Sequence, residues 1–321
     1  MKGSPLSDPH RTGSEVDVPE MKKRTPISEI GSNSVCLLVA EQASGNRIIA
    51  IADEDTVTRI GERQGQGGML SKTAMDRTIA AVARFAARGR ALKVGNIRAI
   101  GTRTLRQAAN TRTFVSRLHK DKGCNIDIVS GEKEAKLSYL SVIQKLGRTN
   151  VVVAGIGGGS TEIKTERGAV SLDLGCVYLS DATLRSDPVT ISEFDTLVGN
   201  IQCVIREAPD ITGPDMTWAG VGGAVKTMAQ VKHRMGSPSS GPAVLTAGDA
   251  YEQMQLYRRL SVDERKTLPG MISKRGDIIL AGAAILHTLM ALYQAQVIYP
   301  SDRGVRYGYL LGQPMFKKVV K

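Results

Sequence analysis

Three glycine-rich loops are the parts of this sequence whose residue types and spacing could do chemistry. Each follows an apolar stretch, and the loops lie within ISEIGSNSV, VVVAGIGGGSTEI and TWAGVGGAVK. Small residues let backbone N–H groups approach an anion closely, and a helix N-terminus behind a loop adds a partial positive charge. Such loops favour a phosphate group as ligand, although one loop by itself is more often a tight turn that serves only the fold.

Particular residues exclude both of the common nucleotide-binding motifs. The dinucleotide fingerprint G-x-G-x-x-G fails in the second loop because Ser160 stands where the last glycine belongs. In the third loop, Val225 occupies the position of the glycine that precedes the lysine of a P-loop, here Lys226. A phosphate site in this chain must therefore be of another type.

The first two loops repeat each other. Residues 30–34 are IGSNS and residues 156–160 are IGGGS, and each set joins two apolar segments that are predicted to be strands. A repeat of this size indicates a duplicated domain rather than a solenoid. We therefore expect two related αβ halves that face each other.

The elements that must position these loops alternate between strands and helices, beginning near Ile27. Strands are predicted at Val35–Ala40, Arg47–Ala52, Asp55–Ile60, Ile97–Gly101, Ile126–Val129 and Gln296–Pro300. Helices are predicted from Ser71, around Leu105 and Phe114, at Glu132–Leu146, Ala247–Leu260, Ser261–Leu268 and Asp277–Tyr293, and from Gly304. This order predicts an α/β fold.

Length and composition limit the protein class. At 321 residues the chain exceeds the roughly 100–200 residues of one domain, which favours two domains sharing a cleft. No apolar run approaches the roughly 18 residues needed to cross a bilayer, so we expect no membrane span. Four cysteines without CxxC spacing argue against a zinc ribbon or a disulfide framework and favour a reducing cytoplasm. Residues 1–26 lack the apolar stretch of a secretory signal and are expected to be a flexible tail.

The net charge of +12 favours a polyanionic partner, although a solvated positive face explains such a charge equally well. Nucleic acid, an anionic membrane and a phosphorylated small molecule are the candidate polyanions. Nucleic acid ranks lowest, because aromatic residues make up only 4% of the chain and the basic residues are not interleaved with them.

Seven segments together carry a resemblance to a known family. In chain order they are ISEIGSNSV, AIGTRTLRQAANTRTFV, IDIVSGEKEAKLSYLSV, VVVAGIGGGSTEI, LDLGCVYLSD, TWAGVGGAVKTMA and GDIILAGAAILHTLM. From about Ile27 onward the chain resembles the exopolyphosphatase and guanosine pentaphosphate phosphohydrolase (Ppx/GppA) family. The resemblance implies the actin-like fold of sugar kinases and Hsp70, with two duplicated αβ domains around a phosphate-binding cleft. The implied domains are residues 27–131 with 307–321, and residues 132–306.

The resemblance also implies the site residues. Glu134 matches the family's general base, which would deprotonate a water that attacks a terminal phosphorus. Glu162 and Glu29 match carboxylates at a Mg²⁺ ion, and Arg106 matches a basic residue lining the cleft. The implied phosphate-binding residues are Gly31, Ser32, Asn33, Ser34, Gly157, Gly158, Gly159, Ser160, Thr161, Gly222 and Gly223.

Five positions depart from the family pattern. Glu29 replaces an Asp and keeps its charge, whereas Gly155 replaces an Asp and loses it. Lys133 replaces the first Glu of a Glu-Glu pair, Cys36 replaces a basic or polar residue, and Tyr307 replaces a Glu. The loss of one anionic ligand beside Mg²⁺ is expected to weaken metal binding by about 1 kcal/mol or more.

The function expected from these features is Mg²⁺-dependent hydrolysis of terminal phosphoanhydride bonds in polyphosphate or a guanosine pentaphosphate-like nucleotide, in the cytoplasm. Two alternatives stay open. One is a weakened family member that binds a phosphorylated ligand or partner and regulates through cleft closure, motivated by Gly155 and Lys133. The other is a phosphohydrolase retuned to a different phosphorylated metabolite. A homodimer also stays open.

Overall fold

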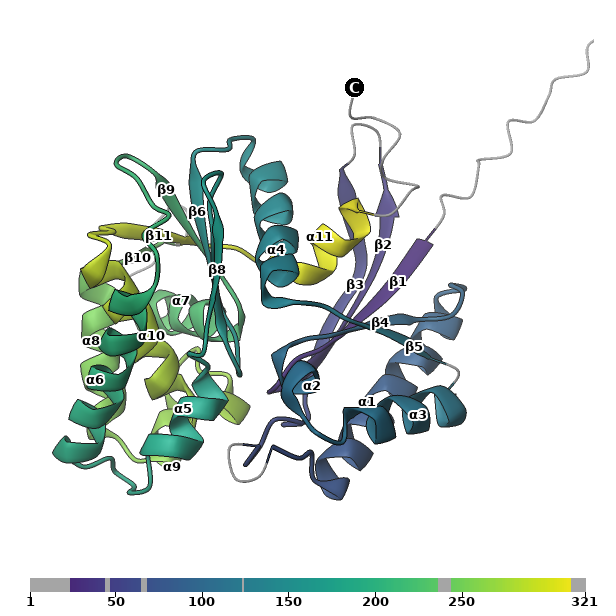
Figure 1. Cartoon of the computed structure of the whole chain (residues 1–321), viewed down its shortest axis with the longest axis horizontal. Coiled ribbons are helices and arrows are strands. Elements are labelled where there is room, and N and C mark those ends of the chain that lie inside the picture. The colour runs from purple at the N-terminus through teal and green to yellow at the C-terminus, as the bar shows by residue number, and fades with distance from the viewer. Residues whose placement is uncertain (1–23, 44–46, 65–67, 123, 236–243, 313–321) are drawn as a thin grey trace, which may run out of the picture.

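Two mixed β-sheets, each covered by helices, lie side by side in the computed structural model (Figure 1). It describes residues 24–43, 47–64, 68–122, 124–235 and 244–312. Of the predicted tail, residues 1–23 lie outside these ranges, and residues 24–26 belong to the first strand. None of the helices in the described ranges has the length and apolar character needed to cross a membrane.

The first sheet has the strand order β3-β2-β1-β4-β5. Its strands are β1 (Arg24–Ile30), β2 (Ser34–Gln42), β3 (Ile48–Val57), β4 (Arg98–Gly101) and β5 (Asn125–Ile128). Its helices are α1 (Lys72–Ala91), α2 (Arg103–Gln107) and α3 (Thr111–Lys122). Successive side chains of a strand point to opposite faces, so Leu37 and Val39 pack with the α1 side of the sheet while Leu38 and Ala40 pack on the other side.

The second sheet has the strand order β10-β11-β9-β6-β7-β8. Its strands are β6 (Val151–Ile156), β7 (Thr161–Lys164), β8 (Ala169–Leu172), β9 (Thr217–Val221), β10 (Leu245–Thr246) and β11 (Val297–Pro300). Its helices are α5 (Cys176–Thr183), α6 (Ile191–Glu207), α7 (Gly223–Met235), α8 (Ala247–Arg259), α9 (Val262–Thr267) and α10 (Ile279–Leu292). The largest apolar cluster of the described residues joins one face of this sheet to these helices.

The two sheets share one topology. In each, three antiparallel strands form a meander, β1-β2-β3 or β6-β7-β8, and the first strand of the meander pairs in parallel with the next sheet strand, β4 or β9. A further parallel strand follows, β5 or β11. The duplicated, actin-like αβ fold predicted from the sequence is therefore confirmed.

Helices α4 (Gly131–Leu146) and α11 (Val305–Leu311) cross between the sheets and join the two halves (Figure 1). Their backbones approach closely, because a Cβ at Gly308 would lie 1.9 Å from the carbonyl oxygen of Leu137. Apolar residues of α11 pack with β1 and β2, while α4 contacts β6, β7 and β8. The predicted domain limits at residues 131 and 307 fall within these crossing helices and remain a prediction.

Most predicted elements agree with the structure, and the differences are of three kinds. Regular structure begins at Arg24, three residues before Ile27. The segments Arg47–Ala52 and Asp55–Ile60 were predicted as two strands, but one strand, β3, covers most of the first and half of the second. A strand at the edge of a sheet tolerates charged side chains, so the acidic residues in its middle do not interrupt it. Two strands, β8 and β10, and two α-helices, α5 and α6, were not predicted.

Candidate active site

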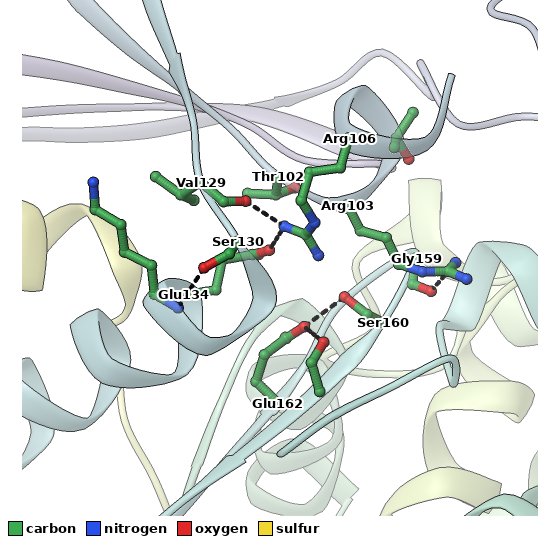
Figure 2. Close-up of polar contacts among 12 residues, drawn as sticks. Thr102, Arg103, Arg106, Val129, Ser130, Glu134, Gly159, Ser160 and Glu162 are labelled. Atoms are coloured by element: carbon green, nitrogen blue, oxygen red, sulfur yellow. Dashed lines mark hydrogen bonds and ion pairs between the residues drawn. The ribbon is translucent and has the colours of Figure 1, made fainter. Parts of the chain in front are cut away.

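A cavity of about 240 Å³ lies between the sheets, where β1, β6 and β9 end in the three glycine loops. Three glutamates line it, Glu29 from β1, Glu134 from α4 and Glu162 from β7. Basic residues that line it are Arg103, Lys226, Arg275 and Arg306. In Figure 2, Arg106 reaches from α2 towards Glu134, and Glu162 lies below them on its strand.

The loops at residues 31–34 and 157–160 form the same tight turn. The Gly31 N–H donates to the Ser34 carbonyl, and the Gly157 N–H donates to the Ser160 carbonyl, each at 2.9 Å. The flanking strands pair in the same way, antiparallel, in both halves. The internal repeat therefore extends to individual hydrogen bonds.

The carbonyl groups of both loops are bound by neighbouring backbone. In the first loop, the Ser32 carbonyl accepts from the Gly61 N–H at 2.9 Å, and the Asn33 carbonyl accepts from the Thr58 N–H at 3.0 Å. In the second loop, the Gly157 carbonyl accepts from the Cys176 N–H at 3.0 Å, and the Gly158 carbonyl accepts from the Val177 N–H at 2.8 Å. In a planar trans peptide, the N–H of the next residue points opposite to the carbonyl. The N–H groups of Asn33, Ser34, Gly158 and Gly159 therefore point away from these supporting segments, as an anion site between the loops requires.

The two loops touch each other in this structure. A Cβ at Gly158 would lie 3.1 Å from the backbone nitrogen of Asn33, and one at Gly159 would lie 2.5 Å from Ser32 Oγ. A side chain at Gly159 would therefore force Ser32 to move, and one at Gly158 would crowd the backbone of Asn33. The two loops are therefore in direct contact where the two halves of the chain meet.

Glu134 is placed by the start of α4. Ser130 caps this helix by accepting a bond from the Lys133 N–H at 3.2 Å, and Glu134 follows in the first turn. Its side chain is only 8% exposed and forms an ion pair with Arg106, which also donates to the Val129 carbonyl at 2.6 Å. Burial, with the nearby Glu162 carboxylate, raises the pKa of Glu134, and Arg106 offsets only part of this rise.

Glu162 is held by hydroxyl groups on one of its oxygens. Its Oε1 accepts from Ser160 at 2.6 Å and from Ser171 at 3.1 Å (Figure 2). Burial raises the pKa of Glu162, opposed by these two hydroxyl groups and by the charges of Arg106 and Arg103. The two glutamates therefore lie close enough to influence each other, with arginine charge beside both.

Glu29 belongs to a separate ionic cluster in the same cavity. Its Oε2 lies 3.7 Å from Arg306 Nε, and the same guanidinium pairs with Asp53 at 2.7 Å. Tyr307 donates its hydroxyl to Asp53 at 2.9 Å. Burial raises the pKa of Glu29, Arg306 lowers it, and the overall shift is upward.

The third loop lies beneath an arginine. Gly222 has a φ of +106°, and a Cβ there would lie 2.3 Å from the Ile156 carbonyl oxygen, so no other residue fits. A Cβ at Gly223 would lie 2.2 Å from Cζ of Arg275. Arg275 also donates to Ser34 Oγ at 3.4 Å and so reaches across the cavity to the first loop.

Comparison with known proteins shows which family this chain belongs to. Residues 38–315 match the Ppx/GppA phosphatase family. The chain belongs to the Ppx/GppA phosphatase family. Exopolyphosphatase 1 of Mycobacterium tuberculosis is 26% identical over 305 residues, which cover 90% of this chain and 87% of that protein. A guanosine-5'-triphosphate,3'-diphosphate pyrophosphatase of Aliivibrio fischeri is 26% identical over 297 residues, which cover 88% of this chain and 58% of that protein.

A solved structure of a Ppx/GppA enzyme from Aquifex aeolicus agrees with this assignment. It superimposes with a TM-score of 0.72 at 25% identity, and the match covers 91% of this chain and 99% of that one. The expected family resemblance and fold are therefore both confirmed.

The residues that depart from the Ppx/GppA pattern differ in where they lie relative to the cavity. Lys133 is exposed and is not among the residues that line the cavity, whereas Glu134 lines it. Cys36 lines the cavity, and burial raises the pKa of its thiol to about 12, which keeps it neutral. Gly155 pairs with Glu162 across β6 and β7, and a Cβ there would lie 3.9 Å from Glu162 Oε2. Gly155 is therefore the departure that removes a side chain from beside a cavity glutamate.

Not every residue implied by the Ppx/GppA resemblance faces the cavity. Arg106 was expected to line the cleft, but it lines neither cavity and instead contacts the lining residue Glu134. Thr161 is fully buried, and its hydroxyl donates to the Leu174 carbonyl at 2.6 Å, so it serves the fold in this structure. Gly31 to Ser34, Gly157 to Ser160, Gly222 and Gly223 all line the cavity. Their role as phosphate ligands remains a prediction.

Sequence reasoning missed three arginines at this site. Arg103 donates to the Gly159 carbonyl at 2.5 Å and pairs with Asp173 at 2.9 Å. Arg275 and Arg306 were likewise not predicted. Arg103 lies within the family-like segment AIGTRTLRQAANTRTFV, and Arg306 is next to Tyr307, one of the departures from the family pattern. These were the available signals.

The residues present do not form a site for the implied Mg²⁺. No group of three or more His, Cys, Asp or Glu side chains in the described part of the chain is placed to hold a metal ion. Glu29 is paired with Arg306, Glu134 is paired with Arg106, and Gly155 contributes no carboxylate. We therefore assign no step of phosphoryl-transfer chemistry at this site to a metal held by these side chains.

A second cavity, of about 710 Å³, lies on the other side of the touching loops. It shares Ser32, Arg103, Gly158 and Gly159 with the first cavity and extends along α5.

Proposed function

We propose that this chain hydrolyses the terminal phosphoanhydride bond of polyphosphate or a guanosine pentaphosphate-like nucleotide. The observation that carries the proposal is the place of Glu134, a buried carboxylate at a helix start beside two facing glycine loops. The names of the relatives support the same substrates, since they are an exopolyphosphatase and a guanosine-5'-triphosphate,3'-diphosphate pyrophosphatase.

The proposed reaction uses the protein's own groups in a fixed order. The backbone N–H groups of the two loops hold the terminal phosphoryl group, and Glu134 accepts a proton from a water molecule as its oxygen attacks the phosphorus. The bond between that phosphorus and its bridging oxygen breaks. The products are inorganic phosphate and a substrate shortened by one phosphoryl group. Arg103 and Arg106 oppose the negative charge that builds up around the phosphorus.

A binding or regulatory role is the second candidate, and Gly155 favours it. If the missing carboxylate abolishes hydrolysis, the loops and arginines still form an anion site, and the loops are still in direct contact where the two halves meet. A hydrolase retuned to another phosphorylated metabolite remains a third candidate.

A substrate panel tests these roles. Phosphate release is measured from polyphosphate, guanosine pentaphosphate and simple nucleoside triphosphates, each with Mg²⁺ and with a chelator. Release from either of the first two supports the proposal, and release only from another phosphorylated compound supports the retuned enzyme. Binding of these compounds without any release would reject hydrolysis and leave the binding role.

A further inference from the structure

The three glutamates of the cavity lie beside arginines of the chain itself. Arg106 pairs with Glu134, and Arg306 pairs with Glu29 at 3.7 Å. Glu162 accepts two serine hydroxyl bonds, and both Arg103 and Arg106 act on its charge. Each glutamate that a divalent cation would need is therefore already matched by a fixed positive charge or by hydrogen-bond donors.

The position that could add a further metal ligand carries no side chain. Gly155 lies opposite Glu162 in the ladder between β6 and β7, and a Cβ there would lie 3.9 Å from Glu162 Oε2. A carboxylate at this position would reach the same point as Glu162. Divalent cations such as Mg²⁺ need anionic oxygen ligands to replace part of their hydration. Glu162 by itself would bind such a cation only weakly.

We infer that this chain does not hold a divalent cation on its own side chains, and that Arg103 and Arg106 supply the fixed positive charge beside the phosphoryl group instead. A cation reaches the cleft only when it is already bound to the phosphate ligand. The inference rests on the proposed function only in that the cleft binds phosphates.

Arg103 lines the cavity, and Arg106 lies directly behind it through its pair with the lining residue Glu134. The Nη1 of Arg106 is shared between the Val129 carbonyl and Glu134, so the guanidinium is held at the start of α4 whether or not a ligand is present. Guanidinium groups bind phosphate oxygens through two parallel hydrogen bonds, which gives direction as well as charge. Arg103 is held in a similar way by Asp173 and by the Gly159 carbonyl, next to the second loop.

The first test measures cation binding with the full-length protein and no phosphate. Mn²⁺ replaces Mg²⁺, and the electron paramagnetic resonance signal of free Mn²⁺ reports what remains unbound. Wild type is expected to leave the signal unchanged at millimolar Mn²⁺, whereas Gly155→Asp is expected to reduce it, and Gly155→Asp combined with Glu162→Gln is expected to restore it. Stoichiometric Mn²⁺ binding by wild type, or no gain in Gly155→Asp, would contradict the inference.

The second test measures pyrophosphate binding by calorimetry in the presence of a chelator. Wild type is expected to bind without any divalent cation. Arg106→Met is expected to lose about tenfold or more in affinity, Arg106→Lys is expected to lose less because it keeps the charge, and Arg112→Met, exposed on α3, is the matched control. Binding that requires a divalent cation, or equal affinities in all four proteins, would overturn the inference.

Both tests are independent of turnover. If no phosphoanhydride is hydrolysed, the proposed function fails, but the Mn²⁺ and pyrophosphate measurements still decide where the positive charge of the cleft comes from.

Discussion

Glu134 is buried beside a second carboxylate, and this placement makes its charge depend strongly on pH. Burial and Glu162 raise its pKa, so the folded protein binds the proton more tightly than the unfolded chain, where the value is near 4.5. Stability from this group is therefore fully present below the unfolded pKa and is lost as the pH rises through the higher folded pKa. Burial raises the pKa of Glu134 to about 9, so only the molecules that have lost this proton can use Glu134 as a general base, and we expect their fraction to grow as the pH rises towards that value.

Glu134→Gln removes this dependence, because the amide stays neutral and keeps the oxygen that accepts from Arg106. We expect the difference in melting temperature, variant minus wild type, to increase as the pH rises from about 6 to about 9. Differential scanning calorimetry at several pH values measures this difference, with Glu132→Gln, exposed in the same helical turn, as control. A difference that stays constant or shrinks over this range would contradict the raised pKa.

The contacts that define each site residue could not be read from local sequence. The glycine loops, Glu134 and Glu162 are recognisable because their segments are short and contiguous. The pairs Arg106–Glu134 and Arg306–Glu29 join residues on different elements, and they depend on how α2 packs near α4 and how α11 returns to β1. Position in the fold decides these pairs.

At the scale of elements, close helix packing holds the two halves together where α4 and α11 cross. Gly308 lies against the Leu137 carbonyl, with no room for a methyl group. We expect Gly308→Ala to lower the free energy of unfolding by about 1–3 kcal/mol, because the helices must separate or distort. Urea denaturation followed by circular dichroism measures the change.

The matched control is Gly199→Ala, in the exposed interior of α6. Nothing lies within 4 Å of a Cβ built there, so the substitution should raise the free energy of unfolding by about 0.5–1 kcal/mol through helix propensity. If both variants change stability in the same direction, the close approach at Gly308 is not the cause.

Elements with local signals were the predictable part of the fold. Helix α1 follows Ser71, whose side chain accepts from the Ala74 N–H at 3.1 Å, and the prediction placed its start correctly. Helix α6 was missed although its signals are in the sequence: Thr190 and Glu193 form a capping box before an apolar face. The prediction divided strand β3 into two because charged residues interrupt its apolar pattern. The strand continues through these residues because it lies at the edge of the sheet.

At the scale of the whole molecule, polar contacts between side chains and backbone link the two halves of the chain. Arg59 pairs with Asp277, the Arg63 N–H donates to Asp181 at 2.9 Å, and Arg103 pairs with Asp173. These contacts join the first half to the second, and with the touching loops they describe a closed arrangement. Since partly exposed ion pairs contribute about 1 kcal/mol or less, the closed arrangement can open without unfolding.

Asp277→Asn weakens one of these contacts, so we expect a larger radius of gyration than for wild type, with at most about 1 kcal/mol lost in stability. Small-angle X-ray scattering measures the radius. Asp263→Asn is the control, because the Asp263–Lys266 pair lies within α9 and does not cross the cleft. An unchanged radius in Asp277→Asn, or an equal change in the control, would show that this pair does not hold the halves together.

The central claim is that Glu134 activates the water that hydrolyses a terminal phosphoanhydride bond. Its most direct test is the turnover number of wild type and Glu134→Gln on the substrate that wild type hydrolyses best, measured together with the affinity of both proteins for that substrate. We predict that turnover falls by about 100-fold or more while affinity stays within a few-fold, because the amide keeps the shape of the side chain but cannot accept the proton. Turnover in Glu134→Gln that matches wild type would contradict the claim.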